Sequence, residues 1–324
     1  MADVFFLPEY GRLYETAGDC ECRCFAYTGE DGTVQHLYLM RPVPWKLDGV
    51  QYYDVVTPYG YGGPVLTRGT ATPEFLRRYY GAWEEHCREN RIVAEFTRFH
   101  LFDNEPLRLA YPGQVGKVSD NVVRRLEPSL DEMWMEFAHK VRKNVKKAVS
   151  AGLTVETDAD GRRLDDFLQI YYQTMERNHA DSFYYFDRAY FQALVDTLPG
   201  HFQFFHVLSE DKVISTELVL CGQDYVYSFL GGTLEEFFPL RPNDLLKYEI
   251  IRWSRDTGHK AFVLGGGYGG NDGIYRYKKS FAPDADVPYY TGRWIHEPRV
   301  YEALTALRRN QGAMNEAYFP QYRG

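Results

Sequence analysis

Alternating apolar and polar residues dominate the first part of the chain and predict a series of β-strands. Arg23–Tyr27 and Gln35–Met40 repeat with a period of two on either side of a turn at Gly29–Gly32, which is typical of two neighbouring strands. Tyr52–Thr57 is predicted as a third strand. It leads into Pro58–Pro64, a loop rich in glycine, tyrosine and proline.

A helix and a fourth strand complete this β-β-β-α-β segment. Thr72 is a suitable N-cap, and Pro73 fits the first position of a helix that should continue to Glu89. Ile92–Phe99 then indicates a strand.

The second half of the chain mixes helices with strands. Ser129 and Glu132 have the spacing of a capping box, which predicts a helix over Ser129–Ser150. The order of elements predicts an α/β (α+β) fold in which a mixed sheet flanked by helices is used twice. The further predicted elements are a strand at Leu153–Glu156, helices at Leu164–Ala180 and Asp187–Thr197, strands at Phe202–Leu208, Val213–Cys221 and Tyr225–Leu230, a helix capped by Asn243 or Asp244 that reaches Thr257, a strand at Lys260–Leu264 and a C-terminal helix at Pro298–Asn310.

Composition narrows the class of protein. A length of 324 residues favours two domains or one large one, and 44% hydrophobic residues suffice for a core. The formal net charge of −8 argues against broad nonspecific nucleic-acid binding, DNA included, although a local basic patch can still act. No apolar run reaches the roughly 18 residues of a membrane span, and the N-terminus lacks the pattern of a signal peptide. We therefore expect a cytoplasmic protein without membrane insertion.

The most informative candidate site is Leu264–Pro283, LGGGYGGNDGIYRYKKSFAP. Glycines such as Gly267 let a backbone approach a ligand closely. Tyr275, Tyr277 and Lys278 then place a cation on an aromatic framework, where it can meet an anion or a developing negative charge. If this segment is extended, Lys279 points the other way and is solvated. No helix is evident after Gly265–Gly270, which disfavours binding of a pyrophosphate there.

Further candidates lie in the first half of the chain. Arg98 and His100 should share one strand face, where they can bind an anionic acceptor or relay a proton. Asn104 is close enough in sequence to assist them. Tyr59 and Tyr61 of the glycine-rich loop can line an acceptor groove. Packing roles explain each of these residues about as well.

Two features of the second half also suggest chemistry. Glu217 interrupts an apolar strand, so it either faces solvent or lines a cleft as a base or ligand anchor, with Tyr227 of the next strand as its partner. The helix around residue 143 is cationic on most of its surface and can contact the phosphates of a tRNA, unless it is simply solvated. Its cationic residues are Lys140, Arg142, Lys143, Lys146 and Lys147.

Several segments of the second half together resemble the Fem family of aminoacyl-tRNA-dependent transferases. The basic stretch Phe137–Ala148, followed by Gly152–Val155, resembles the opening of the family's second domain. Tyr171–Asp187 resembles the helix and loop that follow, and Val213–Leu220 the next strand. Tyr275–Phe281 is similar to the family's aromatic-lysine motif, in which Tyr277 and Lys278 occupy the two positions.

This resemblance implies a tandem pair of acetyltransferase-like (GNAT) domains. They would comprise residues 1–128, joined by the C-terminal helix region 295–324, and residues 129–294. It implies direct transfer of an aminoacyl group from aminoacyl-tRNA to an amine of a peptide, a cell-wall precursor or a small natural product. The family position of Asn178, His179 and Tyr185 makes them groove candidates. The helical arm of many peptidoglycan-building members is missing here, which leaves the acceptor open.

Two other functions remain open. One is ordinary acetyl-CoA-dependent N-acetylation, which the missing Q/R-x-x-G-x-G/A motif disfavours. The other is a catalytically silent relative that binds nucleic acid or peptide. For the favoured aminoacyl transfer we expect no metal, no bound cofactor and no covalent enzyme intermediate, because no nucleophile-base pair is apparent.

Overall fold

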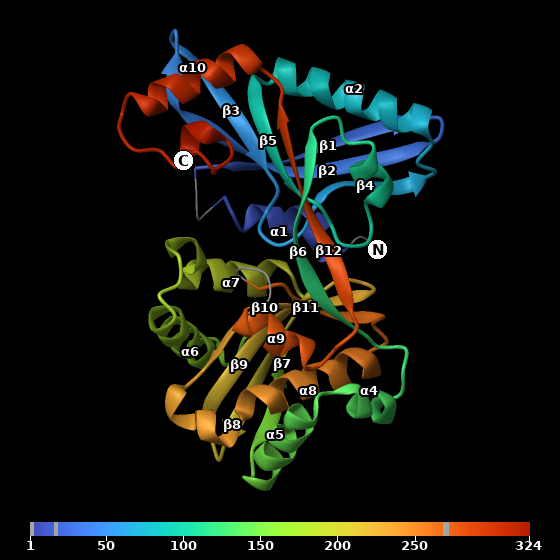
Figure 1. Cartoon of the computed structure of the whole chain (residues 1–324), viewed down its shortest axis with the longest axis vertical. Helices are drawn as coiled ribbons and strands as arrows, with labels where there is room; N and C mark the ends of the chain where they lie inside the picture. Colours follow the sequence, from blue (N-terminus) through green and yellow to red (C-terminus); the bar gives the residue numbers. More distant parts are fainter. Residues whose placement is uncertain (1–2, 16–18, 268–271) are drawn as a thin grey trace. The chain divides into compact units, whose positions relative to one another are not determined.

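The computed structural model describes residues 3–15, 19–267 and 272–324. By its internal contacts the chain divides into two compact units, which we describe one at a time (Figure 1). The first unit comprises Phe5–Val118 and Pro288–Gly324, and the second comprises Ser119–Val287 with residues 3 and 4. Strands β6 (Gln114–Arg125) and β12 (Asp286–Ile295) carry the chain from one unit to the other.

The first unit is built on a mixed, mostly antiparallel sheet. Its strands follow the order β1-β2-β3-β5-β12, β4 pairs with β2, and β3 and β5 are parallel. The elements of this unit are α1 (Pro8–Arg12), β1 (Glu21–Gly29), β2 (Gly32–Leu47), β3 (Val50–Val56), β4 (Gly63–Gly69), α2 (Pro73–Glu89), β5 (Ile92–Arg98), α3 (Glu105–Leu109) and α10 (Pro298–Arg309).

Helix α2 begins as its sequence predicts. The Thr72 hydroxyl accepts a hydrogen bond from the backbone N–H of Phe75 at 3.2 Å, with Pro73 in the first turn. The helix buries Tyr79 and Trp83 against the sheet, and the indole N–H of Trp83 donates to buried Glu95 at 2.6 Å. This polar pairing lets a carboxylate lie inside the core of the first unit.

The second unit also contains a mixed, mostly antiparallel sheet, in the order β6-β11-β10-β9-β8-β7. Strands β10 and β11 are parallel, and the other neighbours are antiparallel. The elements of this unit are α4 (Leu130–Glu136), α5 (His139–Ser150), β7 (Thr154–Asp158), α6 (Leu164–Arg177), α7 (Arg188–Thr197), β8 (Phe202–Ser209), β9 (Lys212–Cys221), β10 (Tyr225–Thr233), α8 (Pro242–Asp256), β11 (Ala261–Gly265) and α9 (Gly273–Lys279).

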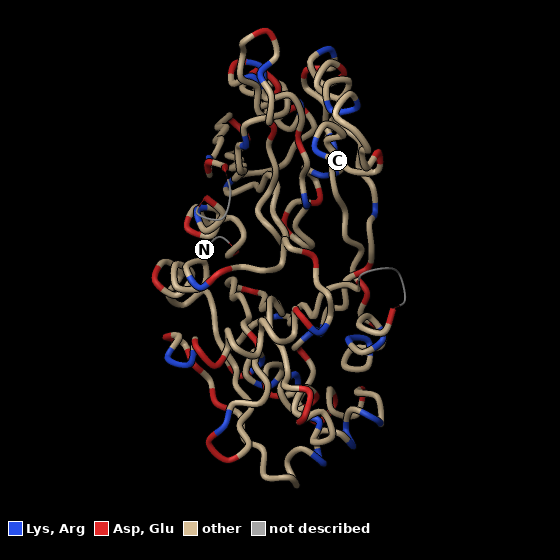
Figure 2. Tube along the Cα trace, turned by 90° about the vertical axis from the view of Figure 1, so that its left-hand side faces the viewer, with Lys and Arg blue, Asp and Glu red and all other residues tan. Residues whose placement is uncertain are grey.

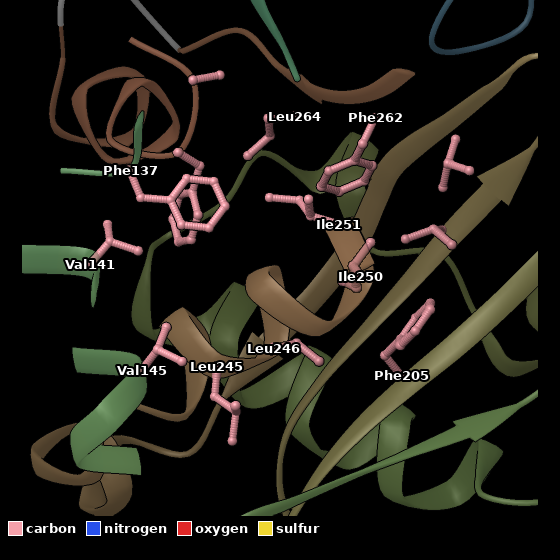
Figure 3. Close-up of a cluster of buried hydrophobic side chains, with 14 of the residues drawn as sticks. Phe137, Val141, Val145, Phe205, Leu245, Leu246, Ile250, Ile251, Phe262 and Leu264 are labelled. Atoms are coloured by element: carbon pink, nitrogen blue, oxygen red, sulfur yellow. The ribbon is translucent and has the colours of Figure 1, made fainter. Parts of the chain in front are cut away.

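Helices cover both faces of this second sheet. Successive side chains of a strand point to opposite faces, and Phe204 packs against Phe167 of α6 whereas Phe205 packs against Trp253 of α8. Figure 3 shows the second of these cores, where Val145 of α5 and Leu246 of α8 lie with Phe205 among the buried side chains. The apolar faces of α5 and α8 are therefore held on one face of the sheet.

The parallel strands β10 and β11 pair over a short distance only. Their register runs from Tyr225 opposite Ala261 to Tyr227 opposite Val263. Beyond this point β10 changes register against β9, between Ser228 and Leu230. Gly265, at the end of β11, has φ +87°, a conformation that favours glycine. The two parallel strands therefore stop pairing with each other just before the glycine-rich segment, while β10 continues to pair with β9.

The predicted mixed α/β fold is confirmed, with some corrections. The single helix predicted over Ser129–Ser150 is two helices, because Phe137 and Ala138 have ψ 141°. The backbone N–H of Ala138 instead donates to the carbonyl of Ser280 at 2.8 Å. Helix α8 begins at Pro242 rather than after a cap at Asn243 or Asp244, and Arg241 before it is left-handed.

Three strands were not predicted, namely β4, β6 and β12. β4 begins at Gly63-Pro64, inside what the sequence indicated was a loop. None of the helices in the described parts of the chain combines the length and apolarity that crossing a membrane requires.

The packing of α5 predicts an asymmetry between two of its valines. Val141 is 2% exposed and Val149 58% exposed. Val141→Ala should lower the free energy of unfolding by about 2 kcal/mol, since it loses buried methyl groups and leaves a cavity. The matched Val149→Ala should change it by less than about 0.5 kcal/mol. Urea unfolding checks both, and equal losses would contradict this placement of α5.

Candidate active site

Lys278 lies where the parallel strands end. Its Nζ donates to the carbonyl of Gly266, just after β11, at 2.7 Å. Desolvation, reinforced by the positive charge of Lys247, lowers the pKa of Lys278 to about 8, although Glu217 and Asp272 act in the opposite direction. A lysine with this pKa exists in both charge states near neutral pH, which suits a group that meets developing charge.

The segment that carries Lys278 is helical, which corrects the expectation of an extended segment with no helix after the glycines. Asp272 is the N-cap of α9, and its carboxylate accepts the backbone N–H of Tyr275 at 2.8 Å. Lys279 binds Asp286 at 2.9 Å, so it has its own carboxylate partner and is separate from Lys278. Residues 268–271, with Gly269 and Gly270 of the glycine run, lie outside the described residues.

The two tyrosines of this motif fix α9 to its surroundings. The hydroxyl of Tyr277 donates to the carbonyl of Asn243 at 3.1 Å, and that of Tyr275 to Asp286 at 2.6 Å. Burial raises the pKa of Tyr277 well above its ordinary value. Gly267 lies against Asp272, since a Cβ there would be 2.7 Å from the carboxylate oxygens. A side chain at position 267 would therefore press on the carboxylate that caps α9.

Glu217 is buried in β9 and bound to a lysine that the sequence analysis missed. Nζ of Lys247, on α8, donates to both carboxylate oxygens at 2.5 and 2.6 Å. Ser228 of β10 donates to Glu217 at 2.7 Å and accepts from Lys247 at 2.9 Å. A helical period would have placed Lys247 on the same buried face as Ile250 and Ile251, an unusual position for a lysine.

The predicted pairing of Glu217 with Tyr227 does not hold. Tyr227 lies opposite Leu220 in the β9–β10 register, whereas Glu217 lies opposite Gly231. The hydroxyl of Tyr227 donates to Asp3 at 2.9 Å, within the second unit. The antiparallel register therefore separates the two side chains, because Gly231, the partner of Glu217, lies four residues beyond Tyr227 in β10.

A pocket of about 540 Å³ lies in the second unit between the beginnings of α5, α8 and α9. Three cationic side chains line it, namely Lys140, Arg241 and Arg276, together with the aromatic rings of Tyr277 and Phe238. Asp244 is the acidic residue of the lining; burial raises its pKa, and Asn144 donates to it at 3.2 Å. Helix beginnings and cations together favour an anion in this pocket.

The predicted cationic helix is α5, and its residues divide into two groups. Lys140, Lys143, Lys146 and Lys147 are exposed. Arg142 instead donates to the carbonyls of Met135 at 2.6 Å and Phe137 at 3.0 Å, at the end of α4. These bonds give Arg142 a structural role where α4 ends, which the exposed lysines of α5 do not share. Basic and acidic residues are otherwise interspersed along the chain (Figure 2).

The remaining candidates of the second unit lie near the end of α6. Asn178 is the exposed C-cap of α6, and His179 follows it with φ +48°. Tyr185 is 41% exposed. These positions are accessible, but no described contact joins them to Lys278.

In the first unit Arg98 and His100 do not share a strand face, because β5 ends at Arg98. Arg98 donates to the carbonyl of Thr57 at 3.2 Å. The buried Nδ1 of His100 accepts the backbone N–H of Asp103 at 3.1 Å. The two side chains are thus held by different partners.

The other first-unit candidates surround the glycine-rich loop. Asn104 is fully buried and donates to the carbonyl of Gly62 at 2.7 Å, which holds the loop in place. Tyr61 packs edge to face against Tyr289, and burial raises its pKa. The carbonyl of Tyr59 accepts from Tyr10 at 2.6 Å. These contacts support a structural role for the loop, beside any role in binding.

Comparison with known proteins defines the fold class. Residues 135–279 match the family model of the acetyltransferase (GNAT) domain, and the chain is a GNAT-fold protein. The sequence has no significant match among curated proteins.

Solved structures of similar fold cover most of the chain. The crystal structure of FemX superposes with a TM-score of 0.72 at 16% identity, over 93% of this chain and 94% of that one. The C-terminal domain of a putative lysylphosphatidylglycerol synthetase from Agrobacterium fabrum gives 0.58 at 12% identity, over 93% of each chain. L-PGS from Bacillus licheniformis gives 0.56 at 15%, over 88% of this chain and 86% of that one. The resemblance to the Fem family is thereby confirmed at the level of the fold.

The surroundings of Lys278 predict a pH-dependent stability. Its pKa is about 8 in the folded protein against 10.5 for an ordinary lysine, so the unfolded chain binds more protons between these values. The wild type should therefore gain stability relative to Lys278→Met as the pH rises from 8 to 10.5. Denaturant unfolding of both proteins at several pH values measures the difference. A difference that stays constant with pH would contradict the shifted pKa.

Proposed function

We propose that the protein is a cytoplasmic acyltransferase that moves an aminoacyl group from aminoacyl-tRNA to the amine of a peptide, a cell-wall precursor or a small natural product. The observation that carries this proposal is the cationic pocket lined by Tyr277, the residue directly before Lys278 in α9. It joins a residue of the α5 helix, Lys140, to the aromatic-lysine motif of the Fem resemblance. A phosphate of the donor would then lie in this pocket, and the reacting ester would be directed toward Lys278, the next residue of α9.

The proposed reaction is a direct aminolysis. The neutral amine attacks the ester carbonyl of the donor, and a bond forms between nitrogen and the acyl carbon. The resulting oxyanion is stabilised by the ammonium group of Lys278. The intermediate then collapses, the bond to the ribose oxygen breaks, and the released hydroxyl takes up a proton equivalent to the one lost by the amine. No acyl group is held by the enzyme in this scheme.

The donor would lie along α5 and end in the pocket. Lys143, Lys146 and Lys147 would contact backbone phosphates outside it, and Lys140, Arg241 and Arg276 would receive the last phosphate. We further propose that both units are GNAT-like domains, because each contains a mostly antiparallel sheet with one parallel pair, β3–β5 or β10–β11.

Acetyl-CoA is the second candidate donor, and two observations favour it. The matching family model is that of an acetyltransferase, and a helix does follow the glycine-rich segment. However, α9 has seven residues, and its N-cap is the carboxylate of Asp272, which would repel a pyrophosphate. A silent binding protein would retain the pocket without transferring anything.

Transfer assays distinguish these three functions. The protein is incubated with labelled aminoacyl-tRNA or labelled acetyl-CoA and a panel of amines. We expect RNase-sensitive transfer from the tRNA. Transfer from acetyl-CoA alone would contradict the proposal, and tRNA binding without transfer from either donor would indicate the silent protein.

The neighbouring lysines of α9 give a matched pair of variants. Lys278→Ala should reduce kcat by roughly 10²- to 10³-fold, the usual cost of losing an oxyanion donor. Lys279→Ala, which breaks the ion pair with Asp286, should leave kcat within about twofold. Steady-state kinetics and a circular-dichroism check of folding measure both. Wild-type turnover in Lys278→Ala would remove this residue from the mechanism.

The exposed face of α5 predicts the salt dependence of tRNA binding. The variant Lys143→Glu/Lys147→Glu should bind tRNA more weakly, and its slope of log affinity against log salt should be shallower by roughly one to two. Filter binding over a series of salt concentrations measures this slope. An unchanged affinity and slope would show that α5 is only a solvated basic helix.

A further inference from the structure

The Glu217–Lys247 ion pair is buried between α8 and the sheet of the second unit. Glu217 is 5% exposed and Lys247 6% exposed, and their neighbours include apolar residues such as Phe262, whose ring lies 5.6 Å from the lysine Nζ. Removing two charges from water costs free energy that their attraction recovers only in part, and well-packed apolar residues often serve stability equally well. A pair kept in this position therefore requires another explanation.

The pair lies at the same end of the sheet as Lys278. Glu217 is opposite Gly231 of β10, beyond the last pairing of β10 with β11. Lys278 is bound to Gly266, just after β11 ends. Both groups thus lie against glycines near the carboxyl ends of the two parallel strands. Nζ of Lys278 is 3.2 Å from the position that a Cβ would take on Gly265, and Cα of Glu217 is 2.9 Å from the position that a Cβ would take on Gly231. The opposite effects of Lys247 and Glu217 on the pKa of Lys278 agree with this geometry.

We propose that the Glu217–Lys247 pair sets the charge on Lys278, and that Lys247 is a positioning residue which acts through Lys278. This inference rests on the proposed function, which gives Lys278 its role. Ser228 holds both members of the pair by hydrogen bonds, so the distance between the two charges is fixed. The pair then supplies a constant field of two opposed charges at the amine that meets the oxyanion.

Other charged groups of the second unit also surround Lys278. Asp272, at the start of α9, favours its cationic form. On the side of β6 the carbonyl of Asp120 lies against Gly266, 3.3 Å from the position of a Cβ there. Arg276 and Lys279 share the last turns of α9. Because these groups stay in place in the variants below, changes in the titration of Lys278 report on the pair.

Substitution of each partner should shift the titration of Lys278 in opposite directions. Lys247→Met leaves the negative charge of Glu217 as neighbour, so the pKa should rise above 8 by roughly one pH unit. Glu217→Gln leaves the positive charge of Lys247 and removes the carboxylate that raises the pKa, so the pKa should fall below 8. Lys247→Arg keeps the positive charge and should keep the wild-type value. The measurement is an NMR titration of ¹³C-labelled lysine, with the Lys278 signal assigned by its loss in Lys278→Arg.

The double variant Glu217→Gln/Lys247→Met is the control for misfolding of the single variants, because it leaves no unpaired buried charge. It removes both charges, keeps similar volumes, and should raise the pKa of Lys278 less than Lys247→Met does, since Lys247 has the larger influence of the two. A purely structural ion pair predicts similar losses of stability in the two single variants and no opposed shifts. The inference is overturned if Lys247→Met fails to raise the pKa, if Glu217→Gln fails to lower it, or if the double variant leaves it unchanged.

The titration tests the electrostatic coupling, and the transfer assay tests the proposed function, so the two can be contradicted separately. If the wild type transfers no aminoacyl group but the titration shifts as described, the electrostatic coupling stands and the proposed function is wrong. If transfer occurs, the alkaline limb of its pH–rate profile should follow the measured pKa of Lys278 in each variant. A limb that stays in place while the NMR titration moves would overturn the role of the pair in the reaction.

Discussion

One constraint governs the candidate active site. The Lys278 amine is largely removed from water at the end of a parallel strand pair. Desolvation disfavours its charged form, and the Gly266 carbonyl and the negative charges of Glu217 and Asp272 offset part of this cost. Such a position is unfavourable for a lysine with no role. It becomes useful where negative charge develops during a reaction, because a partly desolvated cation interacts more strongly than one in bulk water.

The elements around Lys278 hold its amine in place. Asp272 starts the short helix that carries Lys278, and Tyr277 fixes that helix to the beginning of α8. The buried face of α8 carries Lys247 to Glu217, while its first residues line the cationic pocket. The same helix thus contributes to the charge state of Lys278 and to a place for an anion.

Sequence patterns predicted most helices and strands because their signals are local. Thr72 and Ser129 mark helix starts by their own hydrogen bonds, and the period of two in β1 reflects one half-buried face. The missed features depend on distant residues. The break at Ala138 needs the carbonyl of Ser280, and β4 contains a glycine and a proline that usually mark loops. Lys278 was found through a motif, but its neighbour Lys247 was identified only in the folded structure.

The central claim is that the acceptor end of a tRNA reaches Lys278, and chemical trapping tests it most directly. Periodate oxidation converts the terminal ribose of a tRNA into a dialdehyde, which condenses with a nearby neutral amine and is fixed by cyanoborohydride. A lysine with a pKa of about 8 is well suited to this reaction near neutral pH. Peptide mass spectrometry should find the adduct on Lys278, with competition by intact tRNA. Adducts confined to the exposed lysines of α5, or none at all, would contradict the account.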